Sequence, residues 1–202
     1  MAERDHAVNQ SEHAALERFA AAHREDPRSI DVDGSAVPWS VHYHARLCYW
    51  VERFDAGASL PLRLAAACQH IRRWTVPRTS YEAGRRGYRN WRSDLAQMHA
   101  RSAREVLSEV GFDEQTIARV ETLIRKVGLA RDPEVRLFED AICMVFFELE
   151  YADLARKHDD EKLIDILRKT WQKMSPKGRE AALALSAGMG DRERRLLEAA
   201  TR

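Results

Sequence analysis

Apolar residues recur at helical spacing along most of the chain, and the alternation typical of strands is nearly absent. Val41, His44, Cys48 and Val51, for example, follow the three-to-four-residue period of one helix face. The pattern therefore predicts an all-α fold, a single helical bundle. The expected helices cover about residues 10–23, 41–54, 60–74, 89–109, 114–128, 133–157 and 160–174, with short ones starting at 176 and 191.

Capping residues and prolines set the boundaries of these helices. Asn9, with Glu12 at the capping-box position, predicts the start of the first helix. Ser59 and Asp113 are N-caps for the third and fifth helices, and Pro133 opens the sixth. Residues 26–40 and 75–88 contain prolines and glycines and are expected to be loops. Loops of this length inside a compact domain are often functional.

A chain of 202 residues is long enough for one domain with a sizeable core. We find no internal repeat and no linker, so residues 1–202 are interpreted as one domain. Within it, 1–38 form an N-terminal helix and loop, 39–175 the core, and 176–202 the C-terminal helices.

Charge and cysteine content limit the class of protein. The 33 basic and 32 acidic side chains give a net charge of +1, whereas a general nucleic-acid binder usually has a basic excess. No apolar run has the length of a membrane span, and the N-terminus lacks a signal peptide's apolar stretch. We therefore expect a cytoplasmic protein without a membrane partner, with Cys48, Cys68 and Cys143 reduced in its core. The oligomeric state is not indicated.

The segment Gln69–Arg92 combines arginines and aromatic residues between two apolar helical patterns. Planar guanidinium groups and rigid rings are suited to binding an anionic or planar ligand. The alternatives are a solvated basic face, or arginines that pair with Glu82, Glu139 or Asp140 and hold the loop. The candidate ligand-binding residues are Arg72, Arg73, Trp74, Arg78, Tyr81, Tyr88, Trp91 and Arg92.

Polar residues also interrupt the apolar faces of four predicted helices. His44 and His99 lie on such faces, His70 at the edge of another, and Glu139 and Asp140 interrupt the apolar sequence LFEDAICMVFF. Burial of several polar groups is costly unless they are paired, so a shared cavity is expected, with His70 and His99 beside one of the carboxylates. Alternatively, the histidines are hydrogen-bonded core residues and the carboxylates pair with arginines of the segment Gln69–Arg92.

The phrases QHIRRW, PRxxY, GYxxWR and KLIDILRKTW resemble an uncharacterised bacterial and fungal family called domain of unknown function 4202. The resemblance covers about Ala36–Lys177 and implies no established activity.

More distantly, the order of HYHARLCYWVERF, LAAACQHIRRW and LFEDA is similar to the HD-type metal phosphohydrolases, which are helical bundles. This resemblance places His44 or Cys48 at the first ligand position, Gln69–His70 at the His-Asp pair, and Asp140 at the late aspartate. Because the pair is replaced, no metal or other cofactor is predicted. A divalent metal held by His70, His99 and Asp140 is the alternative. We interpret the dipeptide His158–Asp159 as unrelated to the motif.

The resulting hypothesis is an enzyme of hydrolase or lyase type that acts on a phosphorylated or carboxylated small molecule. His70 would be the general acid/base, and Gln69 and His99 would orient substrate or water. Glu139 and Asp140 would fix the protonation of the histidines. The alternatives are a non-catalytic metabolite- or nucleotide-binding module, and an RNA-contacting protein suggested only by the local arginines and aromatics.

Overall fold

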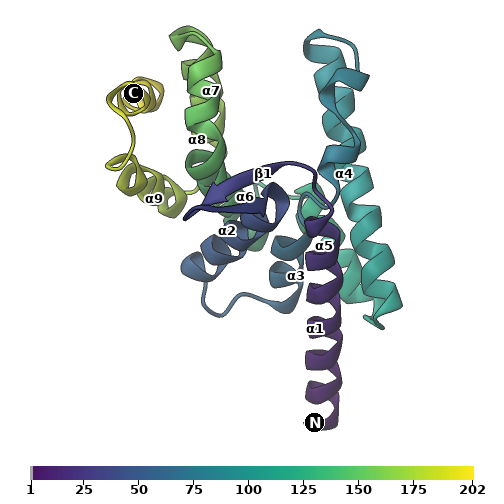
Figure 1. The fold of residues 1–202 in the computed structure, drawn as a ribbon. Coiled ribbons are helices and arrows are strands. Elements are labelled where there is room, and N and C mark those ends of the chain that lie inside the picture. The colour runs from purple at the N-terminus through teal and green to yellow at the C-terminus, as the bar shows by residue number, and fades with distance from the viewer. Residues whose placement is uncertain (1) are drawn as a thin grey trace. The chain divides into compact units, whose positions relative to one another are not determined.

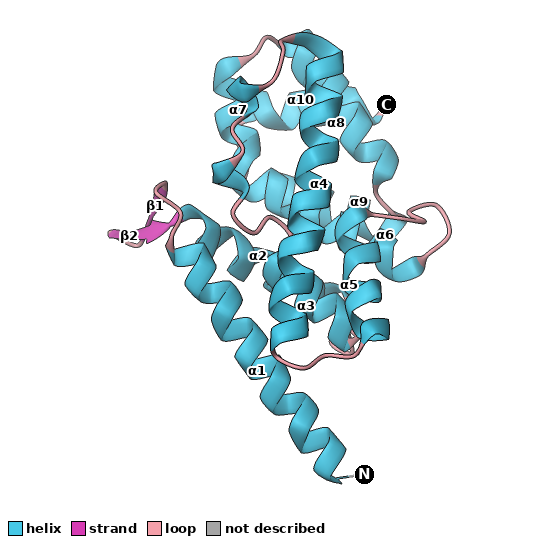
Figure 2. Ribbon diagram, turned by 90° about the vertical axis from the view of Figure 1, so that its right-hand side faces the viewer, coloured by secondary structure: helices cyan, strands magenta, loops and turns pink. Residues whose placement is uncertain are grey.

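The computed structural model describes the backbone of residues 2–202 and the side chains of residues 8–202, and it confirms the all-α fold (Figure 1). Beside the helices, the described chain contains a single two-stranded sheet, shown in magenta in Figure 2. The elements are α1 (Ala2–Arg24), β1 (Ser29–Val32), β2 (Ser35–Pro38), α2 (Trp39–Phe54), α3 (Leu60–Cys68), η1 (Arg73–Thr75), η2 (Arg78–Ser80), α4 (Gly84–Glu109), α5 (Glu114–Arg125), α6 (Pro133–Val145), the π-helix η3 (Phe146–Glu150), α7 (Tyr151–Lys157), α8 (Asp160–Lys173), α9 (Pro176–Ser186) and α10 (Asp191–Thr201).

The chain forms two compact units. The first consists of residues up to Tyr49 together with Gly57–Val127, and the second of Trp50–Ala56 together with Gly128–Arg202. Helix α2 contributes to both. The single-domain assignment of 1–202, with its core at 39–175, stays a prediction because two compact units can belong to one domain.

In the first unit, α3 packs against α1 and α5, and α4 packs along α5. Apolar side chains from each helix are fully or almost fully buried, for example Phe19 of α1, Leu47 of α2, Leu64 of α3 and Leu107 of α4. The short α3 is buried almost throughout, because alanines at 65–67 let its neighbours approach closely. Residues at the end of α3 are therefore held from several sides.

In the second unit, α6 packs against α8 and α9, while α10 packs against α7 and α8. The core includes Phe138, Met144, Leu163 and Leu167, all fully buried. The π-helix Phe146–Glu150 connects α6 to α7 without a break. The sixth predicted helix, 133–157, is thus one rod containing a wider turn.

Several predicted boundaries are confirmed by hydrogen bonds. The side chains of Ser59 and Asp113 accept from the backbone amides of Leu62 and Thr116, and Pro133 opens α6 as expected. Gly111, with φ 87°, follows the end of α4 in the left-handed conformation that glycine adopts readily.

Three predictions about elements are wrong. Helix α1 continues N-terminally past Asn9, so Asn9 is not its N-cap. Residues 29–38 are a β-hairpin rather than a loop, with Asp33 and Gly34 at φ 53° and 81° in its two-residue turn. The third helix ends at Cys68 and α4 begins at Gly84, so the connection between them is 69–83, and it contains two short 3-10 turns.

Candidate functional site

Four histidines from different segments of the first unit lie next to one another. His23 of α1 and His44 of α2 stack with ring centroids 3.7 Å apart and planes 11° apart. The backbone N–H of His70, just past α3, donates to His44 Nε2 at 3.3 Å. The rings of His70 and His99 of α4 are 5.4 Å apart. We call these four residues the histidine cluster.

Hydrogen bonds fix which nitrogens carry protons on one side of the histidine cluster. His44 Nε2 accepts from His70, so its proton lies on Nδ1, which donates to the carbonyl of Ser40 at 2.6 Å. His23 Nε2 lies 2.8 Å from the carbonyl oxygen of Ala67 and therefore donates. Both imidazoles are buried and neutral, because burial lowers the pKa of each.

Four buried polar atoms of the cluster and of the neighbouring Gln69 have no hydrogen-bond partner. They are His23 Nδ1, His70 Nδ1, His99 Nε2 and Gln69 Oε1. Side-chain atoms of this kind are uncommon in native interiors, because each costs about 1–3 kcal/mol when left unpaired. Two of them belong to the neighbouring rings of His70 and His99, which indicates a place where a polar ligand or water can bind.

Burial and positive charge both oppose protonation of His70 and His99. Burial, followed by the charges of Arg73 and Arg92, lowers the pKa of His99 to about 3. Burial, and then Arg73, also lowers the pKa of His70 well below its usual value. Two neutral imidazoles near two guanidinium groups form an environment that favours an anion.

The side chain of Arg73 is held by Trp91 of α4. Its guanidinium carbon lies 4.7 Å from the centre of the Trp91 ring, in cation–π geometry. The Trp91 indole N–H donates to the carbonyl of Val76 at 2.9 Å, and Tyr88 packs on Trp91 with centroids 5.8 Å apart. Trp74 is half-buried in the turn η1, and Arg92 is exposed on α4.

Three residues predicted to bind ligand instead have partners within the protein. Arg78 donates to the carbonyls of Tyr81, Glu82 and Gly84 at 3.0, 2.8 and 3.3 Å, so it holds the loop before α4. Tyr81 donates from its hydroxyl to Asp94 at 2.8 Å. Arg72 forms an exposed ion pair with Glu25 at 3.2 Å. The alternative of a loop-holding arginine therefore describes Arg78, although its partners are backbone carbonyls and not the Glu82 side chain.

Glu139 and Asp140 lie in the second unit and have partners there. Asp140 accepts from the backbone N–H of Ser175 at 2.8 Å and from the Ser175 hydroxyl, immediately before α9. A Cβ on Gly178 would lie 2.3 Å from Asp140 Oδ1, so this helix turn packs directly on the carboxylate. Glu139 lies 3.6 Å from Lys173 Nζ. Burial raises the pKa of Asp140, and the Ser175 hydrogen bonds oppose that effect.

Sequence reasoning missed His23 as a member of the cluster and treated His44 as a core histidine or a metal-site position. A signal was present in the sequence, because His23 continues the helical spacing of Ala15, Phe19 and Ala22, which are all buried on α1.

A pocket of about 180 Å³ between α1, α2 and α3 reaches His23 and His44. Its other lining residues are Leu16, Phe19, Ala20, Arg24, Val41, Ala45, Cys48 and Ala67.

Neither metal binding nor membrane insertion has a structural signature in the described part of the chain. Among residues 8–202, no three histidine, cysteine, aspartate or glutamate side chains are placed to hold a metal ion. No described helix is long and apolar enough to cross a membrane. The absence of a metal cofactor stays a prediction.

Comparison with known proteins gives one match. A family model described as a domain of unknown function (DUF4202) covers residues 13–197. No curated protein and no solved structure matches the chain. Since the match spans most of the sequence, the chain belongs to the DUF4202 family.

Proposed function

We propose that the first unit binds a small anion, a phosphorylated or carboxylated compound, beside His70 and His99, and that these histidines transfer protons to or from it. The observation that carries the proposal is the pair of unpaired buried nitrogens, His70 Nδ1 and His99 Nε2, close to Arg73 and Arg92.

The anion would act on the histidines through charge. Arg73 and Arg92 lower the pKa of His99 in the empty site, and a bound anion would offset that effect. The pKa of His99 would then rise towards neutrality, where an imidazole both accepts and donates protons efficiently. Binding of the substrate would in this way prepare the acid/base group.

Other residues of the first unit would position the reacting groups. His44 accepts from the His70 backbone N–H and so holds His70 in place, while Ser40 fixes the tautomer of His44. The Gln69 side-chain oxygen would accept a hydrogen bond from substrate or water. We leave Glu139 and Asp140 out of the reaction, since Lys173 and Ser175 are their partners.

The alternative is a binding module that uses the same anion site without turnover. One observation favours it: in the described structure no carboxylate accepts a hydrogen bond from the rings of His70 or His99, so neither has the partner that usually stabilises an imidazolium. Both versions require the anion to bind beside His99. They differ only in whether replacement of His70 abolishes a reaction.

The test is a histidine NMR titration of the full chain with inorganic phosphate. We expect phosphate to shift the His70 and His99 ring signals and to raise the pKa of His99. Arg92→Gln should weaken this response several-fold. Arg101→Gln, an exposed position on the same helix without a hydrogen bond or ion pair among the described residues, should leave it unchanged. The proposal is wrong if saturating phosphate leaves both ring signals unmoved, or if the two variants behave alike.

Catalysis is tested separately, with a panel of phosphorylated and carboxylated small molecules. Turnover that His70→Gln abolishes, while phosphate binding persists, supports the enzyme. Phosphate binding without turnover of any compound supports the binding module.

A further inference from the structure

The first turns of α4 carry arginines, although positive charge at a helix N-terminus is destabilising. The chain has seven arginines and one acidic residue between Arg72 and Arg92, although its net charge is only +1. Arg85, Arg86 and Arg89 lie at the N-terminal end of α4, which has no acidic residue in its first turn and no side-chain cap. The helix dipole is positive at this end, so these cations oppose it.

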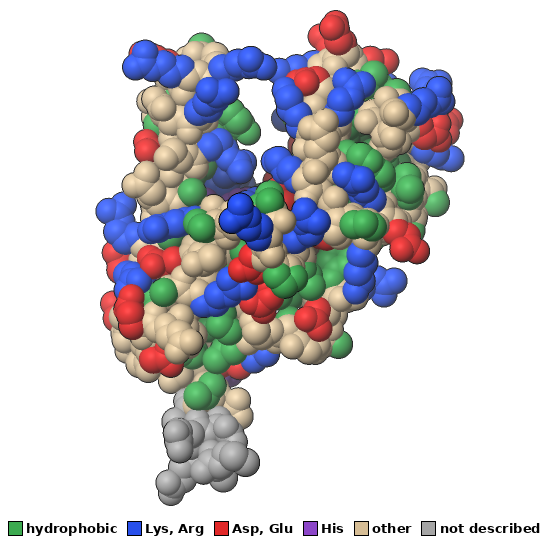
Figure 3. All heavy atoms as spheres, turned by 180° about the vertical axis from the view of Figure 1, so that it is seen from behind, with side chains coloured by type: hydrophobic (Ala, Val, Ile, Leu, Met, Phe, Trp, Pro, Cys, Tyr) green, Lys and Arg blue, Asp and Glu red, His purple; other side chains and the backbone are tan. Residues whose placement is uncertain are grey.

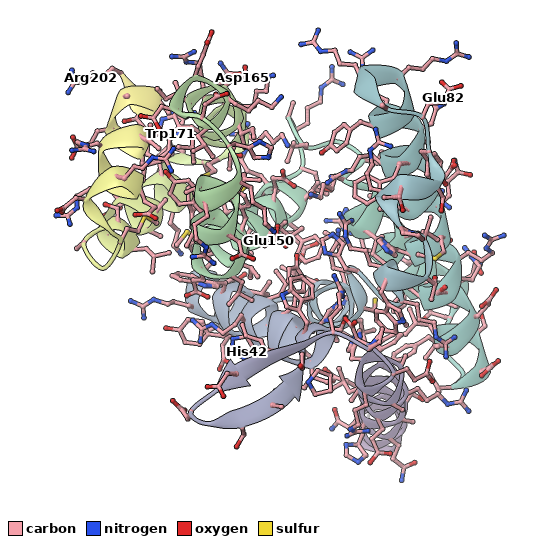
Figure 4. All side chains as sticks on the ribbon, turned by 45° about the horizontal axis from the view of Figure 1, so that its top comes forward. His42, Glu82, Glu150, Asp165, Trp171 and Arg202 are labelled. Atoms are coloured by element: carbon pink, nitrogen blue, oxygen red, sulfur yellow. The ribbon has the colours of Figure 1, made fainter. Side chains whose placement is uncertain are left out.

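These arginines are not neutralised by the protein. Arg85, Arg86 and Arg89 are exposed, and none has a hydrogen bond or ion pair among the described residues. Figure 3 shows blue side chains gathered at this end of α4, at the upper left. In Figure 4, Glu82 marks the loop before α4, and nitrogen-tipped side chains extend away from the helix end above it. The arrangement costs stability and offers charge to a polyanion.

An aromatic ring lies on the same helix face. Positions 85, 88, 89 and 92 follow the three-to-four-residue spacing of a single face, and Tyr88 is 49% exposed among the arginines. Exposed aromatic rings next to cations are the platforms on which unpaired bases stack. A duplex cannot use such a ring, because its bases are stacked on one another, and an acidic peptide has no need of it.

The platform is held rigidly before any ligand arrives. Tyr88 packs on Trp91, whose indole is bonded to Val76 and covered by Arg73. The loop before α4 packs closely on the first helical turn, since a Cβ on Gly87 would lie 1.9 Å from the Glu82 carbonyl oxygen. A rigid surface loses little conformational entropy on binding.

We infer that the N-terminal turns of α4 bind single-stranded nucleic acid, with Arg85, Arg86 and Arg89 on its phosphates and Tyr88 stacked on a base. The rings of His70 and His99 are not part of this surface, although Arg73 supports it through Trp91. His99→Gln therefore leaves nucleic-acid binding unchanged.

The experiment is fluorescence anisotropy of the full chain with a labelled oligouridylate and with a matching RNA duplex. Combined replacement of Arg85, Arg86 and Arg89 by glutamine should lower single-strand affinity more than tenfold. It should also reduce the slope of log affinity against log salt by about 2, at about 0.7 for each lost phosphate contact. Because it removes cations from the positive end of a helix, this variant should melt no earlier than the wild type.

Two further variants separate stacking from charge. Tyr88→Ala should weaken single-strand binding roughly tenfold and leave the salt slope unchanged. The matched control replaces Arg101, Arg131 and Arg195 by glutamine, which removes the same charge from exposed positions elsewhere and should leave affinity unchanged. The inference is overturned if the oligouridylate does not bind at low salt, if the duplex binds as tightly, if Tyr88→Ala has no effect, or if the control triple is equally damaging.

Discussion

Mild acidification is expected to destabilise the first unit, because the histidine cluster is buried in its neutral form. Burial lowers the pKa of His23, His44, His70 and His99 in the folded protein, whereas each titrates near about pH 6.5 when unfolded. Below that pH the unfolded chain binds protons that the folded chain does not. Stability is therefore fully present above the unfolded pKa and falls as the pH falls towards the folded values.

The size of the effect follows from proton linkage. A histidine that stays neutral in the folded state loses about 1 kcal/mol of stabilisation between about pH 6.5 and about pH 5.5. Four such residues give an upper limit of about 4 kcal/mol, a large fraction of the stability of an ordinary domain. Asp26 reduces the loss of stability that protonation of His23 and His44 would cause, because its negative charge raises the pKa of each.

Hydrogen exchange of α3 amides across a pH series would measure this loss, since α3 reports on the first unit alone. His99→Gln should remove about a quarter of the pH dependence. His13→Gln, whose side chain is 76% exposed in the wild type, should remove none of it. A flat stability profile across this range, or an equal effect of the two variants, would refute the reasoning.

Four substitutions test other contacts by unfolding and, for the two arginines, by phosphate affinity. Gly178→Ala should destabilise the second unit by about 1–3 kcal/mol, because its Cβ would overlap the Asp140 carboxylate, and the cost should shrink in an Asp140→Ala background. Gly87→Ala should cost a similar ~1–3 kcal/mol through overlap with a backbone carbonyl that cannot rotate away; a melting temperature equal to the wild type would show that the overlap relaxes. Arg78→Lys should lower the melting temperature and leave phosphate affinity unchanged, since an ammonium group cannot reach three carbonyls. Arg92→Lys should weaken phosphate binding and leave the melting temperature unchanged, since Arg92 has no hydrogen bond or ion pair among the described residues.

Much of the helical architecture was predictable, because it depends on local signals. Ser59, Asp113 and Pro133 mark helix starts through contacts within four residues, and the structure follows them. The hairpin also had a local signal in Asp33–Gly34, which suits a two-residue turn, but its four-residue strands are too short to show clear alternation. The start of α4 had no such signal, because arginines occupy its first turn and no capping side chain precedes it.

The candidate site was predictable in part, for a similar reason. His99 lies on an apolar face of α4, and His70 was placed at the edge of an apolar face of the helix predicted over 60–74. Helical periodicity therefore predicted that the two residues meet, although α3 ends at Cys68, two residues before His70. The partners of Asp140 and Glu139 could not be predicted from helical periodicity, because Ser175 and Lys173 are more than thirty residues further along the chain. No spacing rule links a carboxylate to an amide at that separation.

The π-helical turn at Phe146–Glu150 allows the continuous helical segment from α6 to α7 to pack against different helices at its two ends. A π-turn contains one residue more than an α-turn, so the side that faces inward along α6 is rotated by the time the chain reaches α7. Helix α6 packs against α9, whereas Tyr151 at the start of α7 donates to the carbonyl of Glu193 on α10. A deletion of one residue here would keep the segment helical and leave every other side chain unchanged, yet point the whole of α7 in the wrong direction. The integrity of this half of the protein thus depends on the number of residues in the turn as much as on their identity.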